Sequence, residues 1–235
     1  MDYFDKAETW DRATLETVQL ARLKTTIQQA SRAPFYAKRL AEAGVSADNL
    51  RSLEDIRRIP FTSKDDLRSQ YPYGLATVPH SEFVRMHCSS GTTGTPVAVC
   101  YTQSDINSWA DLMARSLYMA GVRKDDVFQN MSGYGLFTGG LGIHFGAERL
   151  GCMTIPAGAG NSKRQLKLVK DFGTTVAHIL PSYALHLGTT LIEEGEDPKA
   201  LSLRIACVGA EPYTEETRRR IETLFDMKVY NSYGL

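Results

Sequence analysis

The chain has 235 residues, 43% of them hydrophobic, which allows one large or two small domains with a buried core and argues against a disordered protein. Its 27 basic residues balance its 27 acidic ones, so no charge excess favours nucleic acid or an anionic membrane as a partner. No signal peptide and no apolar run of about 18 residues occurs, and the cysteines form no C-x-x-C pair. We therefore expect a cytoplasmic protein in which the cysteines of strand-like segments are buried free thiols.

The first 80 residues are polar and predicted to be helical. Apolar residues recur at helical spacing over residues 13–30, and a second, short helix is expected over residues 36–43. Farther on, Thr62 or Ser63 is expected to be the N-cap of another helix. Residues 1–80 are thus expected to be a helical N-terminal segment.

Residues 81–235 are predicted to alternate between strand and helix. The strand-like segments are residues 83–86, 97–101, 127–131, 152–155, 175–180, 203–208 and 227–231. The helical segments are residues 102–120, 162–172, 182–195 and 214–225, the second opened by a capping box that runs from Ser162 to Gln165. Repeated β-α units with apolar, β-branched strands predict the α/β class with a parallel or mixed sheet.

A hydroxyl-rich loop joins the first two strand-like segments. It contains Ser89, Ser90, Gly91, Thr92, Thr93 and Gly94. Glycine allows positive φ, so successive N–H groups can point into one concavity, and the hydroxyl groups add further donors. Such a loop suits a polyphosphate, and the alternative is a polar hairpin turn. The spacing is not that of a Walker A loop, because no Gly-Lys-Ser/Thr follows and the chain re-enters a strand.

Other unusual loops follow later strands, where ligands bind in open α/β sheets. One is glycine-rich and contains Tyr134, Phe137, Gly139 and Gly140, which would allow a flat apolar group to approach the backbone; the alternative is a turn with glycines for packing. Another consists of Gly209, Ala210, Glu211 and Pro212, where a planar base could lie against the backbone; the alternative is a plain βα loop. The chain ends with Asn231, Ser232, Tyr233, Gly234 and Leu235, where Tyr233 could also be a core aromatic residue.

Taken in order, these motifs resemble those of the acyl-adenylate-forming enzymes. The Pro-Phe-Thr-x-Lys-x-Asp-Leu stretch from Pro60, and residues 134–151, are similar to the phenylacetate–CoA ligase branch in particular. The resemblance spans residues 13–235 and implies the fold of the N-terminal domain of such an enzyme. Because the chain ends before the Thr/Ser and the Glu of the Tyr-Gly-x-Thr/Ser-Glu motif, we expect a truncated N-terminal part without the C-terminal domain, inactive alone.

The resemblance also implies roles for the loops. Residues 89–94 would hold the phosphates of ATP, residues 209–212 would contact adenine, and residues 231–234 would complete the nucleotide site with Tyr233 stacked on the base. Tyr134 and Phe137 would line an aryl pocket, with Gly139 and Gly140 beside them. No catalytic residue and no metal ligand is assigned to this sequence.

The implied activity is that of an AMP-forming acid–thiol ligase that uses ATP, Mg²⁺ and coenzyme A on a small aryl carboxylate. A related adenylyltransferase without CoA transfer, or a non-catalytic nucleotide-binding fragment, would share the same motifs. Thr95 stands where the family usually has lysine, which removes a positive charge near the phosphates; Lys163 and Arg164 are candidates to compensate. A homodimer is compatible with the sequence, which does not fix the oligomeric state.

Overall fold

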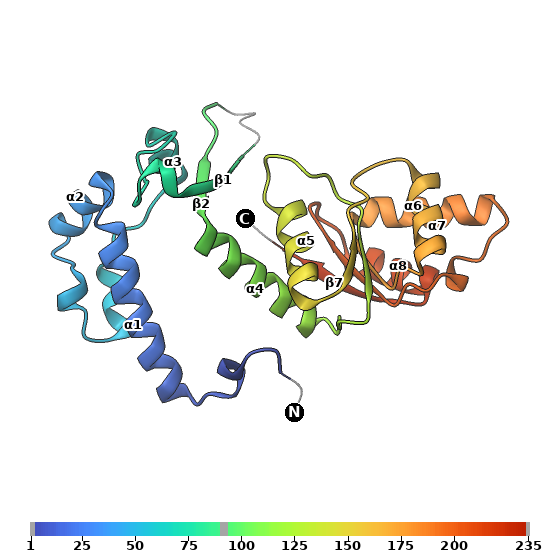
Figure 1. Ribbon diagram of the computed structural model, residues 1–235, viewed down its shortest axis with the longest axis horizontal. Helices are drawn as coiled ribbons and strands as arrows, with labels where there is room; N and C mark the ends of the chain where they lie inside the picture. The colour runs from blue at the N-terminus through green and yellow to red at the C-terminus, as the bar shows by residue number, and fades with distance from the viewer. Residues whose placement is uncertain (1–2, 90–93, 234–235) are drawn as a thin grey trace. The chain divides into compact units, whose positions relative to one another are not determined.

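The structure is a computed structural model that describes residues 3–89 and 94–233. The chain forms two compact units, Met1–Ile106 and Asn107–Leu235, and the division falls within helix α4 (Gln103–Met119) (Figure 1). The sequence pattern predicts a boundary between a helical segment, residues 1–80, and a nucleotide- and acyl-binding region, residues 81–235; this division stays a prediction.

The first unit is built from helices around a small apolar core and from one hairpin. Its helices are α1 (Arg12–Ala30), α2 (Pro34–Glu42) and α3 (Lys64–Ser69), with the short 3-10 helices η1 (Lys6–Thr9), η2 (Ala47–Asn49), η3 (Leu53–Arg58) and η4 (His80–Glu82). Ile27 of α1 and Leu40 of α2 pack with Val45 and Leu50 in this core. The predicted helix over residues 13–30 is confirmed as α1.

Ser63 is the N-cap of α3. Its Oγ accepts a hydrogen bond from the Asp66 amide at 3.1 Å, and the Asp66 carboxylate accepts one from the Ser63 amide at 2.8 Å. The same carboxylate binds Arg39 of α2 at 2.9 Å. The backbone hydrogen bond from Ser63 and the hydrogen bond from Arg39 lower the pKa of Asp66 to about 2. Of the two caps that the sequence offered, Ser63 rather than Thr62 has the role.

The hydroxyl-rich loop joins the two strands of an antiparallel hairpin. Strand β1 (Phe83–Cys88) pairs with β2 (Ala98–Thr102). Beyond the ladder, the Ser89 amide donates to the Val97 carbonyl at 3.0 Å, and the Val97 amide donates to Ser89 Oγ at 3.0 Å. Because the hairpin is not fully covered, Cys100 is only half-buried, which corrects the expectation that it is a buried thiol; Cys152 and Cys207 are buried free thiols as predicted.

The second unit contains a five-stranded parallel sheet with the order β4-β3-β5-β6-β7. The strands are β3 (Val127–Asn130), β4 (Met153–Ile155), β5 (Val176–Ile179), β6 (Ile205–Gly209) and β7 (Lys228–Ser232). The predicted α/β class is therefore confirmed. Because all the strands run in the same direction, their carboxyl ends and the loops that follow them meet at one edge of the sheet.

Helices cover both faces of this sheet. Helices α6 (Ser162–Phe172), α7 (Pro181–Glu193) and α8 (Glu215–Phe225) pack on one face, where Ala206 and Val208 of β6 point. Helix α5 (Gly139–Leu150) and the end of α4 pack on the other face, where Ile205 and Cys207 point. The sequence predicted only a glycine-rich loop in place of α5, because glycine is a poor helix former.

The predicted capping box at the start of α6 is wrong. The N-cap is Asn161, whose backbone has φ of +57° and whose side chain accepts from the Arg164 amide at 3.1 Å. The Gln165 amide group is buried, where it donates to the Gly158 carbonyl at 2.6 Å and accepts from Gln129 Nε2 at 2.7 Å. Gln165 thus joins α6 to β3 and the preceding loop through the interior, rather than capping the helix.

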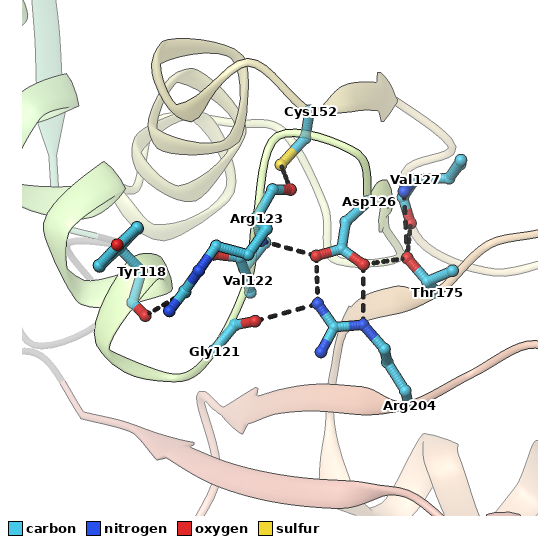
Figure 2. Close-up of polar contacts among 9 residues, drawn as sticks. All are labelled: Tyr118, Gly121, Val122, Arg123, Asp126, Val127, Cys152, Thr175 and Arg204. Carbon is cyan, nitrogen blue, oxygen red and sulfur yellow. Dashed lines mark hydrogen bonds and ion pairs between the residues drawn. The ribbon is translucent and has the colours of Figure 1, made fainter. Parts of the chain in front are cut away.

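A charged cluster ties the strands together at the amino edge of the sheet (Figure 2). Asp126, Thr175 and Arg204 each lie directly before a strand, β3, β5 and β6 respectively. The Asp126 carboxylate accepts from Arg204 Nε at 2.8 Å and from Thr175 Oγ1 at 2.7 Å, and also binds Arg204 Nη2. Burial alone raises the pKa of Asp126, but the hydrogen bonds from Arg204, the Arg123 amide and Thr175 outweigh burial and hold the pKa below its usual value.

Candidate functional site

The predicted phosphate loop is described only at its two ends. Ser90, Gly91, Thr92 and Thr93 lie outside the described residues, so their predicted contacts with phosphate stay a prediction. Ser89 and Gly94 are both exposed. Gly94 has φ of +127°. Residues with a Cβ rarely adopt this backbone conformation, so the position requires glycine.

At the carboxyl end of β6, the backbone of Gly209 lies against the backbone of β7. A Cβ added at Gly209 would overlap the carbonyl oxygen of Ser232, its partner in the parallel register. The next residue, Ala210, is exposed and has φ of +67°, which is strained for a residue with a Cβ. Glycine at 209 is therefore required by strand packing, and its contact with a planar base stays a prediction.

Glu211 caps a helix that belongs to another β-α unit. Its Oε1 accepts a hydrogen bond from the Ser182 amide at 2.6 Å, in the first turn of α7. Leu180, the N-cap residue of α7, has no side-chain acceptor for this amide. The carboxylate also lies at the positive end of the helix dipole. The half-buried Glu211 thus links the loop after β6 to the start of α7, and Pro212 beside it is exposed.

Replacing Glu211 with alanine is expected to lower the free energy of unfolding by about 1 kcal/mol, because an amide at the helix terminus loses its acceptor. Glu193→Ala, which removes an exposed carboxylate from the last turn of the same helix, is expected to change it by less than about 0.5 kcal/mol. Urea denaturation of the two variants tests this. Equal effects would show that Glu211 does not cap α7.

The last strand ends beside β6 with an exposed aromatic ring. Tyr233 is 81% exposed, so the alternative that it is a core residue is wrong. Asn231 is exposed and Ser232 is half-buried, whereas Gly234 lies outside the described residues. An aromatic ring at the carboxyl edge of the sheet provides a surface for stacking with a planar base.

The glycine-rich loop leads from β3 into α5. Phe137 is 47% exposed, whereas Tyr134 is half-buried and its hydroxyl lies 3.1 Å from His144 Nδ1. A Cβ on Gly140 would overlap the carbonyl oxygen of Gly133, and one on Gly139 would meet the Phe137 ring at 3.0 Å. Gly140 is thus needed for tight packing. For this residue, the structure supports the alternative of a turn with glycines for packing. The aryl-pocket role of this loop stays a prediction.

Sequence reasoning missed a buried polar cluster beside this loop. His178 Nδ1 lies 3.0 Å from both Asn130 Oδ1 and Ser132 Oγ. Burial lowers the pKa of His178 to about 4, so the ring is neutral at pH 7. Asn130 and His178 are paired in the register of β3 and β5. The sequence signal that could have revealed this cluster is a polar side chain near the carboxyl end of each of these two apolar strands.

Among residues 3–89 and 94–233, no group of three or more His, Cys, Asp or Glu side chains could hold a metal ion, so no Mg²⁺ ligand is assigned. In the same part of the chain, no helix is both long enough and apolar enough to cross a membrane.

The sequence matches the family described as AMP-binding enzyme over residues 13–235. It is 47% identical to a phenylacetate–coenzyme A ligase from Pseudomonas putida over 98% of this chain and 53% of that protein. It is 46% identical to a protein of the same name from Thermus thermophilus over 100% of this chain and 53% of that protein. The chain thus spans about half the length of the curated relatives it matches.

Similar solved structures include that of a 2-hydroxyisobutyryl-CoA ligase in complex with 2-HIB-AMP and CoA in the thioesterification state. It aligns with a TM-score of 0.89 and 31% identity, over 100% of this chain and 54% of that chain. An open conformation of the same ligase, also with 2-HIB-AMP and CoA, aligns with a TM-score of 0.85 over 94% of this chain and 50% of that one.

Proposed function

This chain belongs to the family of AMP-binding enzymes, and from that premise we propose that the protein containing it joins an aryl carboxylic acid to coenzyme A through an acyl-adenylate. The observation that carries the proposal is the match, along nearly the whole chain, to phenylacetate–coenzyme A ligases from several bacteria. The glycine-rich loop with Tyr134 and Phe137 favours an aryl or arylacetic acid over a long alkyl chain.

The proposed reaction has two steps. A carboxylate oxygen attacks the α-phosphorus of ATP, a P–O bond forms, and pyrophosphate leaves with the electrons of the broken bond. The sulfur of coenzyme A then attacks the acyl carbon, the thiol proton is released to solvent, and AMP leaves. Neither step needs a nucleophile from the protein. Its contribution is to hold two anions together and to stabilise charge on phosphorus.

The loops of the chain would have separate tasks in this scheme. The loop over residues 89–94 would bind the β- and γ-phosphates through amides and hydroxyls. Adenine would lie between the backbone at Gly209-Ala210 and the ring of Tyr233, a task that the exposure of Ala210 and Tyr233 supports. Tyr134 and Phe137 would contact the aryl group. Mg²⁺, when bound, would neutralise charge on the phosphates.

The test is an assay of the protein that contains this chain with ATP, Mg²⁺ and phenylacetate, with and without coenzyme A. We expect repeated turnover to AMP and thioester only when coenzyme A is present, and much less turnover with hexanoate. Repeated turnover without coenzyme A would instead identify an adenylyltransferase. Absence of acid-dependent pyrophosphate release with every aryl acid would refute the proposal.

A further inference from the structure

A chain of hydrogen bonds runs from the surface of α5 to the hydroxyl of Tyr134. His144 Nε2 lies 3.1 Å from Glu148 Oε1, and His144 Nδ1 lies 3.1 Å from the Tyr134 hydroxyl. The imidazole and phenol rings meet edge to face, with centroids 5.7 Å apart and an interplanar angle of 82°. Glu148 is half-exposed, whereas the His144 side chain is only 14% exposed. The chain of contacts therefore leads from solvent inward to the loop after β3.

The partners fix the proton positions in this chain. A carboxylate oxygen accepts hydrogen bonds, so the tautomer of His144 that matches this contact carries its proton on Nε2 and donates it to Glu148. Nδ1 then has a free lone pair and accepts the hydroxyl proton of Tyr134. Glu148 thereby selects the tautomer of His144 that can hold Tyr134.

Asn130 also holds the loop that carries Tyr134. Its Nδ2 donates to the carbonyl of Gly140 at 2.8 Å, and its Oδ1 accepts from Ser132 Oγ at 2.8 Å. Ser132 lies where the loop leaves β3, and Gly140 lies in the first turn of α5. One buried amide thus ties both ends of the loop that carries Tyr134.

The surroundings of the Tyr134 hydroxyl agree with this arrangement. Burial raises its pKa, a hydrogen bond with Asn130 opposes the rise, and the charge of Glu148 adds to it. The phenol is therefore held between β3 and α5. Because each fixed torsion removes freedom that substrate binding would otherwise have to remove, a ring held in this way is a preorganised surface.

We propose that His144, oriented by Glu148, is a positioning residue that holds the ring of Tyr134 as a fixed wall for the aryl group of the acid; this rests on the proposed function. His144 itself is not expected to touch the acid. Its effect should pass through the Tyr134 hydroxyl and should concern the acid rather than ATP.

The test compares His144→Leu with His144→Asn in the protein that contains this chain. His144→Leu is expected to raise KM for phenylacetate about 10-fold, because a half-buried hydroxyl loses its acceptor, and to change KM for ATP by less than about 2-fold. His144→Asn places an amide oxygen near the position of Nδ1 and is expected to recover most of the loss. His186→Leu, at an exposed histidine of α7, is the matched control and should behave as wild type. Equal increases in both KM values for His144→Leu would overturn the proposal.

A double-mutant cycle shows whether His144 acts through Tyr134. In a Tyr134→Phe background, His144→Leu should change KM for phenylacetate by less than about 2-fold, because no hydroxyl remains to be held. If the two effects multiply instead, His144 does not act through Tyr134.

An NMR measurement that does not depend on enzyme activity tests this proposal separately from the proposed function. Tyrosine labelled at ¹³Cζ should give a Tyr134 signal, assigned by its loss in Tyr134→Phe, that moves in His144→Leu and stays near the wild-type position in His144→Asn. An unmoved signal in His144→Leu would refute the positioning role even if the enzyme is active. A moved signal in a protein that releases no pyrophosphate with any aryl acid would confirm the contact but refute its role in acid binding, together with the proposed function.

Discussion

Replacing Arg204 with methionine is expected to lower the free energy of unfolding of the unit with the five-stranded sheet by about 3 kcal/mol at pH 7. The Asp126 carboxylate is 6% exposed, and the substitution removes its only described ionic partner while the carboxylate stays charged. The amide of Arg123 and the hydroxyl of Thr175 would remain as donors, so we expect the lower end of the range for broken buried pairs.

The loss in Arg204→Met should depend on pH. In the wild type the pKa of Asp126 lies below its usual value, so this carboxylate contributes stability above about pH 4, where the unfolded form is ionised, and the contribution is lost as the pH falls through the folded pKa. The difference between wild type and variant is thus expected to be largest at neutral pH and to shrink below about pH 4. Urea denaturation at several pH values measures it.

Arg149→Met is the matched control for Arg204→Met. Arg149 binds Asp111 through two nitrogen atoms, but the two side chains are 48% and 51% exposed. Such a pair contributes at most about 1 kcal/mol, because water screens it. Equal losses in the two variants, or a loss in Arg204→Met that does not change with pH, would show that the Asp126 charge is not the cause.

Replacing Gly209 with alanine is expected to cost about 2–3 kcal/mol of stability and to weaken ATP binding at least 10-fold. The new Cβ would overlap the carbonyl oxygen of Ser232, and neither atom can rotate away, because the backbone fixes the position of both. Strand β7 would have to move, and Tyr233, the proposed adenine-stacking ring, directly follows this strand. Thermal unfolding and equilibrium binding of ATP measure the two effects.

Gly133→Ala is the control for Gly209→Ala. Apart from Gly133 and its two chain neighbours, no described residue has an atom within 4 Å of a Cβ built at Gly133, so this variant should unfold within about 1 kcal/mol of wild type. Wild-type stability in Gly209→Ala would mean that the two strand ends can separate without cost. If Gly209→Ala loses stability but binds ATP as well as wild type, β7 is not part of the nucleotide site.

Much of the fold was predictable because its signals are local. Thr214 was expected to cap α8, and its side chain accepts from the Thr217 amide as predicted. The buried strands β5 and β6 follow from short apolar runs. Such signals need no knowledge of which segments meet.

Helix α5 was missed because its glycines have a tertiary reason. A Cβ at Gly142 would overlap the indole of Trp109, and one at Gly146 would overlap Met113, both on α4. Packing between α4 and α5 thus outweighs the low helix propensity of glycine. The local sequence does not predict this contact, because it joins segments about 33 residues apart.

The candidate site divides in the same way. The loops could be located from the sequence, because each follows a predicted strand. The contacts that hold these loops in place could not be predicted from the sequence, because they join different elements. Glu211 binds the start of α7, and Asn130 meets His178 only through the register of β3 with β5. Both depend on the three-dimensional order of the strands.

The Arg204–Asp126 tie lies at the amino ends of β3 and β6, and the loops with Tyr134 and Ala210 follow the carboxyl ends of the same two strands. The contacts that anchor these strands and the loops proposed to bind the substrates therefore lie at opposite ends of β3 and β6. A laboratory library aimed at a different acid can vary the exposed residues 135–137 of the first loop while the anchor stays intact, and extra stability gained at the amino edge enlarges the set of tolerated loop sequences. The fold thus separates exposed loop residues that can be varied from buried residues that stabilise the sheet.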